Sequence, residues 1–114
     1  MKITHLYTSD DNKSYFKEIA SSSSIKKELG FYLEEYPVKK MYFRDFEKGL
    51  TFDWHCAPQA QYIIYLEGEV EVQASGGEKR LFKAGDILFV TDVKGDGHIT
   101  KTLSNGRSIV VTAE

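Results

Sequence analysis

The sequence predicts an all-β protein, an antiparallel β-sandwich or barrel. Strand-sized apolar segments recur along the chain, and the breaks between them contain Gly, Pro, Asn or Asp almost every time. No segment keeps a helical period long enough to supply a layer of helices. The chain of 114 residues fits a single domain, residues 1–114, which would bury roughly two-thirds of its unfolded surface.

The predicted elements follow one another at short intervals. Strands at 2–8 and 14–19 are separated by the turn-forming "SDDNK". A polar loop is expected at 21–24, followed by one short helical turn at 24–30, with Ser24 as its cap and Gly30 at its end. The remaining strands are expected at 38–46, 50–56, 61–66, 69–74, 79–83, 86–91, 98–103 and 108–113.

Glu67 and Gly68 predict a tight turn that joins segments 61–66 and 69–74 into a β-hairpin. In that pairing one face of the hairpin carries Gln61, Ile63, Tyr65, Val70, Val72 and Ala74, and we expect this face to point into the core. The opposite face carries Tyr62, Ile64, Leu66, Glu69, Glu71 and Gln73. It is more apolar than a solvated strand requires, so we expect a partner subunit or another segment of the chain to cover it.

Composition and charge narrow the function classes. A net charge of −2 without a basic patch gives no reason to expect a nucleic-acid partner. The longest apolar runs have the length of strands, and the N-terminus lacks the apolar stretch of a signal peptide, so no membrane association is expected. The single cysteine cannot form an internal disulfide, and we expect a cytoplasmic location.

In segment 49–68, five residues separate Gly49 from His55, and Gly68 stands at the end of the segment. This pattern resembles the first sequence motif of the cupins, specifically of small single-domain (RmlC-like jelly-roll) members, which Gly49 opens and Gly68 closes at the expected spacing. Ala57 stands where the family has a second histidine, and Gln61 stands where it has a glutamate.

The second cupin motif is matched more loosely. Gly85 opens it in "AGDILFV", and Thr91 occupies its proline position. The following segment is longer than in the family pattern, His98 is the candidate histidine, and Thr102 falls at the asparagine position. The two motifs together span residues 49–102, and residues 1–48 would supply N-terminal strands and the short helical turn.

The resemblance implies a metal site inside the barrel. The positions that match the family's ligands place His55, Gln61 and His98 around a divalent transition metal such as Ni, Mn, Fe or Zn. A small-molecule ligand and a homodimer are expected. Isomerase, lyase or oxygenase chemistry on a sugar-like or organic-acid substrate would be compatible with such a site. The alternative is a non-catalytic binding or sensing module without metal, so whether the protein is an enzyme stays open.

The orientation of His55 is open on sequence alone. Leu50, Phe52, Trp54 and Cys56 share one face of their strand, and simple alternation therefore sends His55 to solvent. The family motif requires His55 to face inward. Both hold if the strand is covered on both sides, for example by a dimer contact at Phe52 and Trp54, or if a bulge near Pro58 resets the alternation.

Other polar residues are assigned with the same arguments. His98, Thr100 and Thr102 share one strand face, which either lines a cavity together with Tyr65 or lies in solvent. His5 is expected to be structural or on the surface, Cys56 to be a small buried side chain, and Glu69 and Glu71 to be solvated. Asp86 and Asp92 are interpreted as turn residues.

Overall fold

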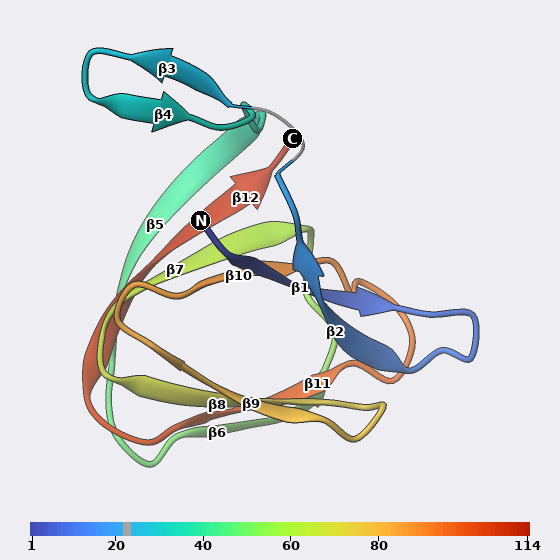
Figure 1. Ribbon diagram of the computed structural model, residues 1–114. Helices are drawn as coiled ribbons and strands as arrows, with labels where there is room; N and C mark the ends of the chain where they lie inside the picture. Colours follow the sequence, from blue (N-terminus) through green and yellow to red (C-terminus); the bar gives the residue numbers. More distant parts are fainter. Residues whose placement is uncertain (22–23) are drawn as a thin grey trace.

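The computed structural model describes residues 1–21 and 24–114 and shows two β-sheets facing each other around one core (Figure 1). The six-stranded sheet has the order β2-β1-β10-β7-β12-β5, and the four-stranded sheet has the order β6-β11-β8-β9. The strands of these sheets and of the small β3-β4 hairpin are β1 (Ile3–Thr8), β2 (Ser14–Ile19), β3 (Ile25–Lys27), β4 (Gly30–Tyr32), β5 (Val38–Phe46), β6 (Thr51–His55), β7 (Gln61–Glu67), β8 (Glu69–Ala74), β9 (Lys79–Lys83), β10 (Ile87–Val90), β11 (His98–Thr102) and β12 (Gly106–Ala113).

The all-β prediction is confirmed. The predicted segments 14–19, 38–46, 69–74 and 79–83 coincide with strands of the structure, and the other predicted strands differ at their ends by at most two residues. Neighbouring strands pair in the antiparallel sense, except that β1 runs parallel to β10. Within the described residues no helix is long and apolar enough to cross a membrane.

The predicted helical turn at 24–30 is wrong. This region forms the β3-β4 hairpin, in which Ile25 pairs with Tyr32 and Lys27 pairs with Gly30, and it projects from the barrel in Figure 1. One helical turn cannot repay the cost of helix nucleation, whereas two short strands supply each other with hydrogen-bond partners. Of the predicted polar loop 21–24, Ser22 and Ser23 lie outside the described residues.

The predicted pairing of segments 61–66 and 69–74 is also wrong. β7 pairs with β10 and β12 in the six-stranded sheet, whereas β8 pairs with β9 and β11 in the four-stranded sheet. The chain crosses between the sheets at Gly68, whose φ of 89° and close approach to the Asn105 carbonyl exclude a side chain.

The predicted inner face is nevertheless confirmed. Ile63, Tyr65, Val70, Val72 and Ala74 are all buried. Side chains alternate with a period of two on both sides of the crossing, so the same residues point inward whether the strands pair directly or face each other. The core therefore draws apolar side chains from both sheets, and the buried Tyr65 ring stacks on Phe82 with ring centroids 5.5 Å apart.

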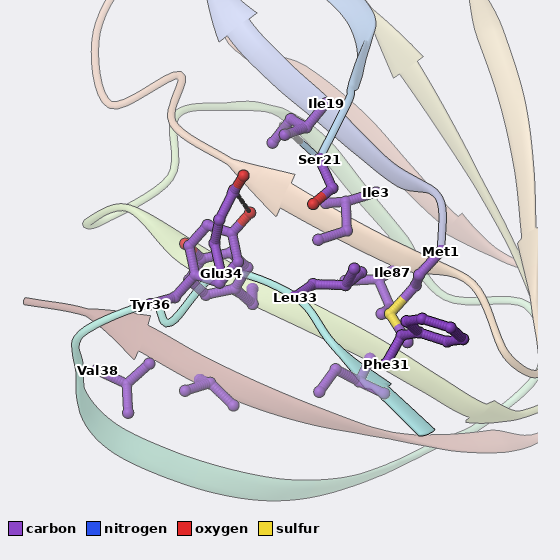
Figure 2. A pocket seen from close by; sticks show the side chains of 13 residues that line it. Met1, Ile3, Ile19, Ser21, Phe31, Leu33, Glu34, Tyr36, Val38 and Ile87 are labelled. Atoms are coloured by element: carbon purple, nitrogen blue, oxygen red, sulfur yellow. Dashed lines mark hydrogen bonds between the residues drawn. The ribbon is translucent and has the colours of Figure 1, made fainter. Parts of the chain in front are cut away.

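The outer face of the six-stranded sheet is apolar as well. The strand registers place two rows of side chains across it: Met41, Val111, Tyr62 and Phe89 in one row, and Phe43, Ile109, Ile64 and Ile87 in the other. Segment 31–38 lies over part of this face and encloses a cavity of about 580 Å³, with Phe31, Leu33 and Tyr36 opposite Ile3 and Ile87 (Figure 2). The sequence analysis expected a partner subunit or another segment of the chain to cover the face that carries Tyr62 and Ile64. Segment 31–38 covers part of that face.

Candidate functional site

A second cavity, of about 520 Å³, lies between the two sheets. Its lining includes all the residues that the sequence analysis assigned to the site, namely His55, Gln61, Tyr65, His98, Thr100 and Thr102. By contrast, the cavity under segment 31–38 is lined by apolar side chains apart from Ser21, Glu34 and the tyrosine hydroxyls. The cavity between the sheets, called the barrel cavity below, is therefore the one that gathers imidazole and amide groups.

A β-bulge in β6 turns His55 inward. In the pairing of β6 with β11, His55 lies opposite His98 and Phe52 lies opposite Thr100. Asp53 and Trp54 together therefore face the single residue between His98 and Thr100, which shifts the alternation by one residue. As a result both Phe52 and His55 line the barrel cavity. The bulge lies within the strand, upstream of the expected position near Pro58.

The two histidines of the barrel cavity lie side by side. Their ring centroids are 4.3 Å apart with the planes tilted by 57°, and the Phe52 ring stacks on His55 at 3.5 Å. Nδ1 of His55 lies 2.7 Å from the Asp53 carbonyl oxygen, which can only accept, so Nδ1 carries the proton and Nε2 keeps its lone pair. Burial lowers the pKa of His55, and this favours the neutral ring that a metal requires.

Asp92 holds the second histidine. Its Oδ2 lies 2.5 Å from Nδ1 of His98, and both side chains are buried. Asp92 does lie in a turn, as interpreted from the sequence, because the Val93 N–H donates to the Thr91 carbonyl across it, but the sequence analysis missed the role of its side chain. Asp86 also caps a turn, by accepting the Lys83 backbone N–H. With Nδ1 engaged by a carboxylate, Nε2 is the nitrogen that His98 can offer to a ligand, an arrangement common behind metal-binding histidines.

Oδ1 of Asp92 has no hydrogen-bond partner in the part of the chain that the structure describes. The backbone beside it is fixed, because the Asp92 carbonyl accepts the N–H of Ala57 at 3.1 Å. A buried carboxylate with one unsatisfied oxygen is costly, so the contact with His98 has to offset part of the cost of burying Asp92.

Cys56 is half-buried, whereas a buried side chain was predicted. Its Sγ lies 3.3 Å from the Gly95 carbonyl oxygen, to which the thiol donates, and it forms part of the wall of the barrel cavity. The thiol therefore has a structural partner of its own. This partner is a backbone carbonyl and not the ring of His55, so the geometry does not make the two residues a nucleophile and its base.

Gly97 packs directly against the bulged strand. Its φ is 75°, and a Cβ at this position would lie 2.1 Å from the His55 carbonyl oxygen. We expect Gly97→Ala to lower the free energy of unfolding by about 2 kcal/mol more than Gly49→Ala. Both substitutions strain a positive φ, but at position 97 the backbone at His55 must also move to make room for the Cβ. Gly49 is the matched control, since its φ is 87° and a Cβ there would have no atom within 4 Å. Urea denaturation of the two variants measures the difference. Equal losses of unfolding free energy would contradict the prediction and mean that β6 shifts to accommodate the Cβ without a loss of stability.

The donors fit a divalent ion in part. Two imidazoles with free Nε2 atoms and the amide oxygen of Gln61 line one cavity, and each histidine has its Nδ1 oriented by an oxygen acceptor. The residue at the fourth family position is the buried Ala57. Across residues 1–21 and 24–114 no group of three or more His, Cys, Asp or Glu side chains is placed to hold a metal, so a site here would need a ligand of another type, such as the Gln61 amide.

Comparison with known proteins supports the fold. A cupin-2 domain-containing protein from Shewanella frigidimarina NCIMB 400 has a TM-score of 0.52 at 17% identity, over 65% of this chain and 69% of that one. Protein NMB1881 from Neisseria meningitidis has a TM-score of 0.54 at 10% identity, over 70% and 84% of the two chains. No protein-family model matches this chain.

A curated relative matches over a short segment. It is the oryzines biosynthesis cluster protein J of Aspergillus oryzae (strain ATCC 42149 / RIB 40), 40% identical over 43 residues, which are 38% of this chain. The chain spans about a quarter of the length of that relative, 24%.

The double sheet, the jelly-roll neighbours and the position of the cavity together show that this chain has the fold of a small cupin.

Proposed function

We propose that this small cupin binds an organic molecule in the barrel cavity beside a divalent transition metal held by His55, Gln61 and His98. The observation that carries the proposal is the β6 bulge, which places the His55 ring against His98 with both Nε2 atoms left for a ligand. When bound, such an ion would act as a Lewis acid that polarises a carbonyl or carboxylate oxygen.

The chain's own residues have separate tasks in this proposal. Asp92 orients His98, and the Asp53 carbonyl orients His55. Thr100 and Thr102 add hydroxyl groups to the cavity wall, although Thr102 already donates to the Glu47 carbonyl. The cavity wall has few polar groups in an apolar surround, which is typical of small-molecule sites. If the protein is an enzyme, this wall is compatible with isomerase, lyase or oxygenase chemistry on a sugar-like or organic-acid substrate.

Metal content tests the proposal. Protein purified without an affinity tag is incubated with nickel, manganese, zinc or iron, desalted and analysed by mass spectrometry of the elements. We expect about one equivalent of at least one metal per chain. Less than about a tenth of an equivalent of all four would remove the metal from the proposal, because a specific site of this kind retains its ion through desalting.

A second candidate function is a metal-free binding or sensing module. The observation that favours it is the ligand set itself, in which Ala57 and Gln61 bring neither the imidazole nor the negative charge found in the family pattern. An organic ligand that binds equally well before and after treatment with a chelator would select this candidate.

We propose that a second copy of the chain packs on the outer face of the six-stranded sheet. The two apolar rows extend beyond segment 31–38 to the edge strand β5, where Phe43 is 77% and Met41 is 56% exposed. None of the side chains in these rows is charged, and a sheet face of this kind is typical of packing against another sheet.

Light scattering tests the dimer. We expect the wild-type chain to be a dimer and Phe43→Glu to be a monomer with an unchanged circular dichroism spectrum, because a buried unpaired charge opposes association. Leu81→Glu is the control, since Leu81 on β9 is 48% exposed but belongs to the other sheet. A monomeric wild type, or a Phe43→Glu variant that stays dimeric, would contradict the proposed surface.

A cytoplasmic location completes the proposal and rests on the single cysteine. Neither a nucleic acid nor a membrane is proposed as a partner, because the net charge is −2 and the sequence holds no basic patch.

A further inference from the structure

Arg44 is the one side chain with a permanent charge among the described residues that line the barrel cavity. This described lining contains no Asp and no Glu, so the titratable groups that face the cavity beside Arg44 are His55, His98, Tyr65 and Cys56. The cavity is thus a largely apolar space with one fixed positive charge in its wall.

The strand register explains why this arginine lines the barrel cavity. Arg44 on β5 pairs with Ser108 on β12, and Ser108 lies beside Tyr65 on β7, so the three side chains form one row on the inner face. Nε of Arg44 donates to Oγ of Ser108 at 3.1 Å, and Ser108 is itself buried. Burial raises the pKa of Tyr65 and the charge of Arg44 partly opposes that rise, as expected for a guanidinium close to the phenol.

The anchored guanidinium keeps donors for a ligand. Nε is engaged by Ser108, and no carboxylate in the described part of the chain forms an ion pair with Arg44. Its two terminal nitrogens therefore lack an anionic partner within residues 1–21 and 24–114. A planar guanidinium with terminal N–H groups left for a ligand is well suited to bind a carboxylate in bidentate fashion.

The positive charge and the histidines lie at opposite ends of the barrel cavity. Tyr65, next to Arg44, lies close to the crossing at Gly68. Gln61 is at the other end of β7, four residues before Tyr65 and roughly 13 Å from it. His98 is also at the far end, since it pairs with Ala74, the last residue of β8. Between the two ends the wall is mostly apolar and includes Ile63, Leu88 and Val72, with one hydroxyl group from Thr100, which pairs with Val72.

We propose that the barrel cavity takes an elongated organic acid whose carboxylate binds Arg44, whose apolar body lies along β7, and whose far end reaches His55 and His98. Arg44 then determines specificity for acids over neutral molecules of the same shape. This inference rests on the proposed function only in placing the ligand in the barrel cavity, and it holds with or without a metal at the histidines.

Matched pairs of acids and amides test the inference. The probes are benzoate, 3-phenylpropanoate and 4-phenylbutanoate, each paired with its amide, and the protein is stripped of metal with a chelator and then dialysed. Ligand-observed NMR or calorimetry gives the affinities at pH 7. We expect at least one acid to bind about tenfold more tightly than its amide, as a charge-assisted bidentate contact at a solvent-accessible arginine allows.

Variants assign the preference to Arg44. In Arg44→Gln the acid and the amide should bind equally, whereas Arg107→Gln should keep the preference, since Arg107 is an exposed β12 arginine that is paired with Glu67 outside the cavity. Ser108→Ala, which frees the guanidinium, should weaken the preference without abolishing it. The inference is overturned if no acid binds more tightly than its amide or if Arg44→Gln retains the difference.

The outcome is separable from the metal proposal. Acid preference in a protein that holds no metal would leave this inference standing and remove the ion at His55, Gln61 and His98. A full equivalent of metal in a protein without acid preference would support the metal site and overturn the acid-binding inference.

Discussion

His98→Ala is expected to abolish metal occupancy, from about one equivalent in the wild type to less than about a tenth. The variant removes one of the two imidazoles in the proposed ligand set, whose third member is the neutral amide of Gln61. A single imidazole with an amide oxygen is too weak a set to retain a first-row ion through desalting. Elemental analysis after incubation with each metal measures the loss.

Two further variants keep this result interpretable. His98→Ala leaves Asp92 buried without its partner and can lower stability. His55→Ala is therefore made in parallel, because His55 is less buried and its ring bonds to the Asp53 backbone carbonyl and not to a buried carboxylate. Both should lose the metal. His5→Ala is the control, since His5 lies on β1 outside the cavity and contacts Thr91. Occupancy retained in both cavity variants would show that the ligand set is wrong.

Asp92→Ala is expected to lower the free energy of unfolding by about 3 kcal/mol. The substitution leaves Nδ1–H of the buried His98 without an acceptor, and water has little access to replace the carboxylate. Asp92→Asn should cost less than half as much, because the amide oxygen can still accept from Nδ1. Guanidinium denaturation at pH 7 followed by circular dichroism gives the three values.

Asp86→Ala is the matched control for this prediction. Asp86 accepts a single hydrogen bond from the Lys83 backbone at the protein surface, so its loss should cost about 1 kcal/mol. If Asp92→Ala proves no more harmful than Asp86→Ala, the contact between Asp92 and His98 does not stabilise the folded chain. A nearly equal loss in Asp92→Asn would instead mean that the negative charge matters more than the acceptor.

Much of the fold was predictable because its signals are local. Turn-forming residues bound each strand, and alternation within a strand identified Ile63, Tyr65, Val70 and Val72 as inward-facing. The predicted helical turn failed for the opposite reason, because so short a segment carries too little local signal to separate one helical turn from a β-hairpin.

Residues of the candidate site were predictable only where the alternation of side chains within one strand determines their direction. The inward direction of Gln61 follows from the alternation that it shares with Ile63 and Tyr65. The roles of Asp92 and Arg44 were not predictable, since their partners are fixed by tertiary structure: Arg44 bonds to a serine 64 positions away, and Asp92 lies in a loop without periodicity.

The sequence by itself determined the positions of the strands in the two large sheets, the inner face of β7 and β8, and the resemblance to cupins, because turns and alternation are properties of neighbouring residues. Only the tertiary structure decided that the chain crosses between sheets at Gly68 and that a bulge opposite β11 turns His55 inward. Both depend on registers between strands that are far apart in the chain, and a register is set by how the whole sheet packs.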